Sequence, residues 1–326
     1  MQDDTRTLMK PQKTKTRYGI LAQSAHSTTC KHRFRKRIYI PSIIAALILA
    51  GAAGYWLYVL RSTKTAKSWQ SAVISLASVD YLEQVYRFGA NADGLGPKGT
   101  ITMRSDFSDP ATPKSKGTFD MDVGVIGRTI KLKSDFLCVS EVECYIKYIA
   151  FTAPEELTTE KPANLNTWLQ FDPTTNNNNS ADVFGIVGNV NTVLGELIIG
   201  NITGQAKQMI HDAAKNKTTY KIMSTRVSKN SNQNSVQYDI RANTDDLISI
   251  NSAVANQYSI ANNYDAQTAF VDTFSAWVDT TTNTIFKLEY EQGDTTTSIQ
   301  YSVYSEKPNI QAPVDYLKPQ EYSRVI

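Results

Sequence analysis

An uncharged apolar run of 23 residues, from Ile38 to Leu60, divides the chain into two unequal parts. As a helix rising about 1.5 Å per residue, it would be roughly 34 Å long, slightly more than the ~30 Å hydrocarbon core of a bilayer. Basic residues precede the run, and Tyr55, Trp56 and Tyr58 lie at its end, a pattern typical of a membrane span. We therefore expect one transmembrane helix, with the N-terminus in the cytoplasm and the rest of the chain outside.

A cleaved signal peptide is the alternative for this run, because Ala50-Gly51-Ala52 resembles a signal-peptidase site. The apolar run continues beyond that site to Leu60, and the basic region before it is unusually long, so a retained anchor at the cell membrane is favoured. The sequence thus predicts three parts, which are a disordered basic cytoplasmic tail over 1–37, a transmembrane helix over 38–60 and an extracytoplasmic domain over 61–326.

The charge of the chain is unevenly distributed. The formal net charge is +3, but residues 61–326 carry 24 basic and 29 acidic residues, a net of −5. A nucleic-acid-binding domain needs a clustered basic face, so this class is disfavoured. His211 is the only histidine after the apolar run, which argues against a His-rich zinc site. No catalytic or phosphate-binding motif stands out, and we expect no enzyme activity, metal or cofactor.

Two cysteines are spaced for a hairpin. Cys138 and Cys144 lie in LCVSEVECYI between two strand-like runs. Outside the membrane they could pair across that hairpin, and this disulfide is the one we predict. Two reduced core cysteines are the alternative. The closed loop is short, so the chain-entropy model gives a stabilisation of only about 2 kcal/mol.

Period-two alternation of apolar and polar residues dominates the expected domain. It runs from Gly99 to Phe171 and predicts half-buried antiparallel strands. It returns in the last third of the chain, where a short helix over Thr244–Gln257, capped by Thr244, interrupts the strands. The strands expected there are Lys217–Lys229, Ser235–Ala242, Phe270–Asp279, Thr284–Glu291 and Thr295–Tyr304.

Two longer stretches have helical spacing. Ala66–Phe88 carries an apolar stripe and is followed by Gly89 as a stop. Val183–Lys215 is also periodic, but it contains five glycines, and we expect it to break near Gly200–Gly204. An apolar, loosened helix suits a movable lid. A core helix whose glycines allow close packing is the commoner role for such a segment.

The order of these elements resembles the lipoprotein-carrier superfamily, which includes periplasmic LolA-type carriers and mycobacterial LppX/LprG-type lipoproteins. The resemblance is most detailed where Ala276-Trp277-Val278-Asp279-Thr280 ends a strand in an Asp-led turn and Ile285-Phe286-Lys287-Leu288-Glu289 begins the next. It covers about residues 66–318 in outline. It implies an α+β fold in which a curved antiparallel sheet, a half-barrel, is closed on its concave side by helices around an apolar cavity for acyl chains.

The function that this resemblance implies is that of a non-catalytic carrier or sensor of a lipid or lipoprotein ligand. The expected transmembrane anchor departs from the free and lipidated forms of the family, and it favours local lipid handling or sensing over transport across a gap. A cell-envelope structural or surface interaction protein with a filled core is the alternative. The residues expected to line the cavity are Ile101, Met103, Phe119 and Met121 from the sheet, with Phe184, Val187, Leu194 and Ile198 from the central helix.

Overall fold

The computed structural model describes residues 50–56, 64–90, 96–125, 128–140, 142–154, 164–171, 193–194, 197–230, 233–259, 272–292, 295–319 and 321. The chain divides into two compact units, Met1–Leu60 and Arg61–Ile326, and each is described by itself. In the first unit, residues 50–56 are helical, while the predicted tail and most of the predicted span lie outside the described residues. No helix within the described ranges is long and apolar enough to cross a membrane.

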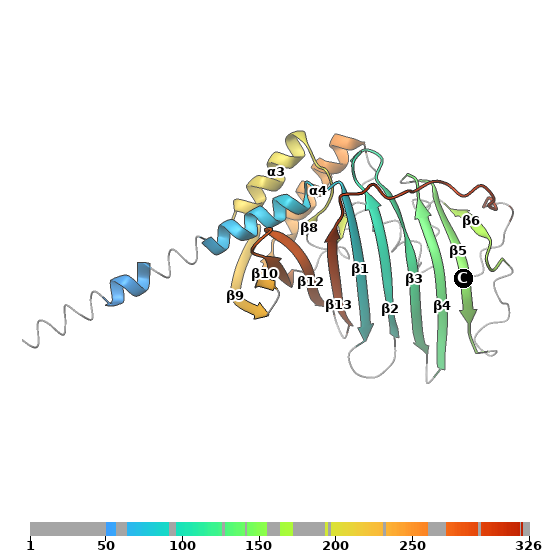
Figure 1. Ribbon diagram of the computed structural model, residues 1–326, viewed down its shortest axis with the longest axis horizontal. Coiled ribbons are helices and arrows are strands. Elements are labelled where there is room, and N and C mark those ends of the chain that lie inside the picture. The colour runs from blue at the N-terminus through green and yellow to red at the C-terminus, as the bar shows by residue number, and fades with distance from the viewer. Residues whose placement is uncertain are drawn as a thin grey trace, which may run out of the picture. The chain divides into compact units, whose positions relative to one another are not determined.

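The second unit is built on one large curved sheet of eleven antiparallel strands (Figure 1). Their order across the sheet is β6-β5-β4-β3-β2-β1-β13-β12-β11-β10-β9. The strands are β1 Tyr81–Ala90, β2 Gly96–Asp106, β3 Lys114–Val125, β4 Arg128–Cys138, β5 Cys144–Thr152, β6 Trp168–Phe171, β9 Tyr220–Asn230, β10 Gln233–Ala242, β11 Thr273–Asp279, β12 Thr284–Gln292 and β13 Thr295–Val303. The predicted alternation from Gly99 to Phe171 and the five predicted late strands are thereby confirmed.

Alternation gives the sheet one apolar face, called here the inner face. In β4, Leu132 and Phe136 are buried on this face, whereas Lys131 and Lys133 are exposed on the other, outer face. The two blocks of strands meet where β1 pairs with both β2 and β13. The inner face is therefore continuous from one block to the other, although the blocks are far apart in the sequence.

Three helical segments gather near β9–β13 in Figure 1. They are residues 64–76, α3 (Gly204–Lys215) and α4 (Thr244–Tyr258). Trp69 of the first segment packs on Tyr238 of the inner face. The side chain of Asn243, and not Thr244 as predicted, caps α4 by accepting bonds from the backbone N–H groups of its first turn. The structure is thus an α+β fold with a helical segment packed on the inner face of a curved antiparallel sheet.

The prediction of a helix over Ala66–Phe88 is wrong in its second half. Helical residues end at 76, and β1 begins at Tyr81. Apolar residues from Val79 to Phe88 fit helical spacing by coincidence, but Leu82 and Tyr86 alternate as in a strand and are both buried. Pairing with β13, more than 200 residues away in sequence, decides the conformation of this segment.

The predicted helix over Val183–Lys215 is also corrected. In its described part, β7 (Val193–Leu194) and β8 (Leu197–Ile198) form a two-stranded hairpin, and helix begins only at Gly204. The break expected near Gly200–Gly204 is confirmed, because these two glycines adopt positive φ of 128° and 62°. The branched residues before Gly200 favour extended backbone.

The predicted disulfide between Cys138 and Cys144 is confirmed. The two residues lie directly opposite each other where β4 ends and β5 begins, and both side chains are fully buried. The backbone N–H of Val139 donates to the carbonyl of Glu143 at 3.0 Å and closes the turn. The bridge therefore stiffens one hairpin at the inner face.

A C-terminal strap, residues 304–319, crosses the ends of the strands from β13 to β6 (Figure 1). At its start the N–H of Tyr304 donates to the carbonyl of Tyr81 at 3.1 Å. Near its end Leu317 exchanges two backbone bonds of 2.8 Å with β6, one to Trp168 and one from Gln170. The strap thus pairs with β6, which is the outermost strand on that side of the sheet.

Candidate functional site

The candidate site is the centre of the inner face, over β13, β1, β2, β3, β4 and β5. The strand register places side chains there in rows that run across the sheet. One row is Tyr301, Gln84, Met103, Gly117, Phe136 and Ile146, and the next is Ile299, Tyr86, Ile101, Phe119, Ser134 and Tyr148. Apart from Gly117, which has no side chain, the residues of these two rows are at most 7 % exposed, and none of them is acidic or basic. The centre of the inner face is therefore a wide, uncharged and mainly apolar surface.

The structure brings five of the eight predicted cavity residues into one hydrophobic core. Ile101 and Phe119 are directly opposite each other, and Met103 lies two residues along β2. Met121 packs against the same core while remaining partly exposed, and Ile198 is 3 % exposed. That these residues contact a ligand stays a prediction. Phe184 and Val187 lie outside the described residues, and for Leu194 only the backbone of β7 is described.

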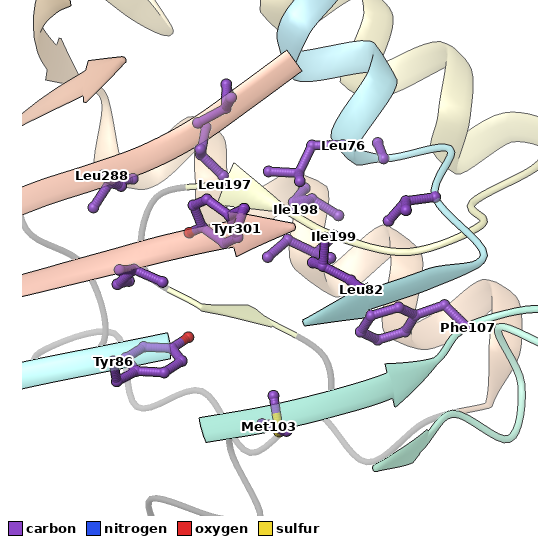
Figure 2. Close-up of a cluster of buried hydrophobic side chains, with 14 of the residues drawn as sticks. Leu76, Leu82, Tyr86, Met103, Phe107, Leu197, Ile198, Ile199, Leu288 and Tyr301 are labelled. Carbon is purple, nitrogen blue, oxygen red and sulfur yellow. The ribbon is translucent and has the colours of Figure 1, made fainter. Parts of the chain in front are cut away.

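A cover segment, residues 197–202, lies on the inner face. Figure 2 shows Leu197, Ile198 and Ile199 beside Tyr301 and Leu82 of the sheet. Backbone bonds of 3.2 Å and 3.0 Å run from the N–H groups of the cover segment's residues 200 and 202 to the carbonyls of residues 76 and 77, where the first helical segment ends. The cover segment is thus attached to a helix end on one side and packs on the sheet by apolar contact on the other.

Gly200 gives the cover segment its shape. Its φ of 128° is a conformation that side chains rarely adopt, and a Cβ there would come within 3.4 Å of the Phe107 ring. The segment therefore turns sharply against the end of β2, where Phe107 is buried.

Gln84 is the one amide in the apolar centre, where Ser134 of β4 is also a buried polar residue. Gln84 of β1 is 0 % exposed, and neither atom of its side-chain amide has a hydrogen-bond partner among the described residues. The sequence analysis missed this residue because it assigned Gln84 to a helix. The pattern Leu82-Gln84-Tyr86, a strand with an amide at an inward position, was the signal that could have identified it.

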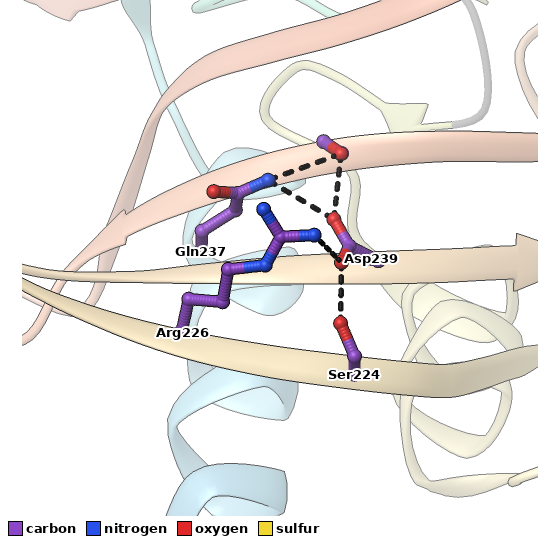
Figure 3. A network of polar contacts seen from close by, with 5 residues as sticks. Ser224, Arg226, Gln237 and Asp239 are labelled. Carbon is purple, nitrogen blue, oxygen red and sulfur yellow. Dashed lines mark hydrogen bonds and ion pairs between the residues drawn. The ribbon is translucent and has the colours of Figure 1, made fainter.

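On the outer face, polar side chains of neighbouring strands form hydrogen bonds and an ion pair with one another around Asp239. Figure 3 shows Asp239 of β10 between Ser224, Arg226 and Gln237. Its carboxylate accepts hydrogen bonds from Ser224, from Gln237 at 3.0 Å and from Ser275 at 2.7 Å, and it forms an ion pair with Arg226 at 3.3 Å. Burial alone would raise the pKa of Asp239, but these contacts lower it on balance. This part of the sheet offers a solvated polar surface, in contrast to the inner face.

Two pockets lie under the C-terminal strap. The first, of about 280 Å³, is lined by Arg104, Lys116 and Tyr304 among others, and the second, of about 410 Å³, by Lys114 and Ile310 among others. Three contacts fasten the strap around them, which are Lys116 Nζ to the Asn309 carbonyl at 2.6 Å, Lys307 Nζ to Asp106 at 3.2 Å, and Arg104 over the Tyr304 ring at 5.2 Å. These charged groups are used to hold the strap in place.

Asp106 is the buried partner in the ion pair with Lys307 of the strap. Burial alone would raise the pKa of its carboxyl, but hydrogen bonds from Ser108 and the contact with Lys307 lower it below the ordinary value. A group whose pKa is lowered by folding stabilises the protein above its unfolded pKa of about 3.9, and this stabilisation is lost as the pH falls through the folded pKa.

We therefore expect Asp106→Asn to lower the free energy of unfolding by about 1–3 kcal/mol at pH 7. The difference from the unchanged protein should begin to shrink below about pH 4 and should be lost as the pH falls through the lowered folded pKa of Asp106, where the carboxyl group becomes neutral like the amide. Urea unfolding at pH 7 and at pH 3 measures the effect. Asp120→Asn, at an exposed position of β3, is the matched control and should change stability by less than about 0.5 kcal/mol. Equal effects of the two substitutions would contradict the assignment.

Metal chemistry has no geometric basis in the described part of the chain, where no group of three or more His, Cys, Asp or Glu side chains could hold an ion. His211 lies on α3, with its Nδ1 atom 3.7 Å from the carboxylate of the adjacent Asp212. The chemistry that the inner face can perform is the binding of apolar groups.

No protein-family model matches this chain, and no curated protein sequence matches it either. Three solved structures are similar to this chain. LprF from Mycobacterium bovis has 10 % sequence identity and a TM-score of 0.40, and the match covers 76 % of this chain and 96 % of LprF. LppX from Mycobacterium tuberculosis has 7 % identity and a TM-score of 0.37, with 76 % of this chain and 97 % of LppX covered, and a LolA superfamily protein from Nitrosomonas europaea has 8 % identity and a TM-score of 0.22, with 74 % and 94 % covered. LppX-type and LolA-type proteins are the kinds that the sequence resembles.

Proposed function

We propose that this protein is a membrane-anchored, non-catalytic carrier or sensor that binds an acyl lipid against the inner face of its sheet. The observation that carries the proposal is the uncharged, mainly apolar surface that extends over β13 and β1–β5. Each methylene group buried there would contribute about 0.8 kcal/mol. A chain of roughly fifteen methylenes would thus gain on the order of 10 kcal/mol before the cost of immobilisation.

Entry of a ligand requires the cover segment to leave the inner face. Its described backbone bonds to the end of the first helical segment are few, and its contacts with the sheet are apolar and non-directional. An acyl chain can replace such contacts without leaving polar groups unpaired. Leu197, Ile198 and Ile199 would then exchange their contacts with the sheet for contacts with the ligand.

The predicted anchor supplies the location. In this proposal residues 38–60 span the cell membrane, the tail lies in the cytoplasm, and the domain over 61–326 stands outside, next to the outer leaflet. Acyl lipids are most concentrated there, and a tethered domain can receive them without diffusing through water. The tether favours exchange with the membrane, or with a lipoprotein in it, over transport across a gap.

A filled core without any ligand is the alternative, and one observation favours it. Met103 and Phe119 are 0 % exposed, so the side chains of the protein already surround them in this conformation. A cell-envelope structural or surface interaction protein would keep such a core closed permanently. The two functions differ in whether an acyl chain ever reaches these side chains.

Photo-crosslinking in the native membrane tests the proposal. The full chain is expressed in cells fed a fatty acid that carries a diazirine in its acyl chain, and the labelled residues are mapped by mass spectrometry after irradiation. We expect label on β2 and β3, around Met103 and Phe119, and on the cover segment. The exposed outer-face residues Lys131 and Lys133 of β4 serve as the internal control. Label restricted to the outer face or to residues 38–60 would overturn the proposal and favour the filled core.

A further inference from the structure

The side chain of Gln84 is the one amide in the two central rows of the inner face. Met103 of β2 and Tyr301 of β13 are its partners in the strand register. Leu82 and Tyr86, its inward neighbours along β1, are buried as well. Gln84 is 0 % exposed, and its Nε2 and Oε1 atoms both lack a partner among the described residues. The amide is thus enclosed by large, mostly apolar side chains at the centre of the proposed binding surface.

Stability alone does not explain a glutamine at this position. Nearly all buried polar groups in folded proteins have a hydrogen-bond partner, since an unpaired one loses its bonds to water without replacement. Leucine or methionine would fill a similar volume without that cost. An amide at the centre of the inner face therefore indicates a partner that belongs to the function of the protein and not to its folding.

The chemistry of the amide defines this partner. A glutamine side chain donates through Nε2 and accepts through Oε1, so it matches a group that presents an acceptor and a donor side by side. The two central rows contain no acidic or basic side chain, so a phosphate or an ionised carboxylate would be buried there without a counter-charge. An uncharged head group fits both conditions.

We propose that Gln84 recognises the head of a neutral acylglycerol, with Nε2 donating to an ester carbonyl and Oε1 accepting from a free hydroxyl group. This inference rests on the proposed lipid-binding function and adds the class of lipid to it. The acyl chains would lie along the apolar rows, and the glycerol would lie at β1, beside Met103 and Tyr301. Gln84 would thereby select esters that carry a hydroxyl over hydrocarbons of the same length.

Competition between two ligands in native mass spectrometry tests the inference. The full chain in a non-ionic detergent is mixed with equal amounts of dioleoylglycerol and of its dioleyl ether 3-O-methyl analogue, which lacks both carbonyl and hydroxyl. The ratio of the two complexes in one spectrum gives the preference. We expect the unchanged protein to prefer dioleoylglycerol by about tenfold or more, and Gln84→Met to lose this preference while still binding the ether.

Two further variants make every outcome decisive. Gln300→Met, the same exchange at an exposed outer-face position of β13, should keep the preference. Gln84→Leu repeats the main test with a second apolar side chain, and both Gln84 variants should unfold at a temperature equal to or above that of the unchanged protein. An unaltered preference in the Gln84 variants, or a marked loss of stability in both, would overturn the role of Gln84 while leaving lipid binding intact. Failure of the unchanged protein to bind either lipid would overturn the proposed function itself.

Discussion

Replacing Gly117 with alanine is expected to lower the free energy of unfolding by at least about 3 kcal/mol, at the upper end of the range for overpacking. Gly117 lies in a central inner-face row, opposite Met103 and Phe136. A Cβ atom at this position would come within 2.0 Å of the Thr102 carbonyl oxygen and 2.8 Å of the Phe136 ring. Backbone cannot rotate away as a side chain can, so β2 and β3 would have to separate. Urea unfolding of the full chain measures the loss.

Gly89→Ala is the matched control for this substitution. Gly89 also lies within a strand of the same sheet, but an added Cβ would meet only the Lys98 Cβ atom at 3.5 Å, an ordinary contact distance. We expect a change of no more than about 1 kcal/mol, and in the stabilising direction if the restriction of the unfolded chain dominates. If Gly117→Ala were as mild as Gly89→Ala, the strands around the proposed site would be far more adaptable than their packing indicates.

The strands could be predicted because their signal is local. Within β2 and β3, alternation by itself places Ile101 with Met103, and Phe119 with Met121, on one side of a strand. The hairpin turn between β4 and β5 then fixes the register that aligns Cys138 with Cys144. Neither step requires knowledge of distant parts of the chain, which explains why the sheet, its inner face and the disulfide were all predicted.

Long-range pairing explains what the sequence analysis missed. The segment that forms β1 fits helical spacing, and only its pairing with β13 makes it a strand. With that error Gln84 was placed on a helix and its inward position was lost. The register of β1 against β2 and β13 depends on contacts between residues such as Tyr86 and Ile299, more than 200 positions apart, which a local pattern does not encode.

The sequence pattern also could not predict whether the inner face encloses an open cavity or a filled core. Periodicity says which side of a strand is apolar, but it does not say how large the opposing side chains are. The volume left within this core depends on every side chain in it, including Leu197 and Ile198, which the sequence analysis assigned to a helix and the structure places in a hairpin and cover segment. The cavity residues were therefore predicted as a face, and the ligand has to be tested by experiment.

Removing the side chain of Trp69 should cause the second large effect, because Trp69 joins the first helical segment to the sheet. It is 1 % exposed, and its ring centroid lies 5.6 Å from that of Tyr220, 5.5 Å from Tyr238 and 6.4 Å from Phe274. The Tyr238 hydroxyl also donates to the carbonyl of Thr65 in the same helix at 3.0 Å. We expect Trp69→Ala to cost about 3–5 kcal/mol, as measured by urea unfolding and by loss of the near-ultraviolet circular dichroism of the aromatic cluster.

Trp277→Ala provides the control, because Trp277 lies on the outer face and is only partly buried. The ring of Trp277 contacts Lys287, whose Nζ atom is 4.3 Å from the ring centroid, and removal should cost about 1 kcal/mol or less. Equal losses from the two substitutions would mean that the helix contributes little to the core. The helical residues 64–76 end where the cover segment is bonded, so the docking of Trp69 also holds the attachment point of the cover segment against the sheet.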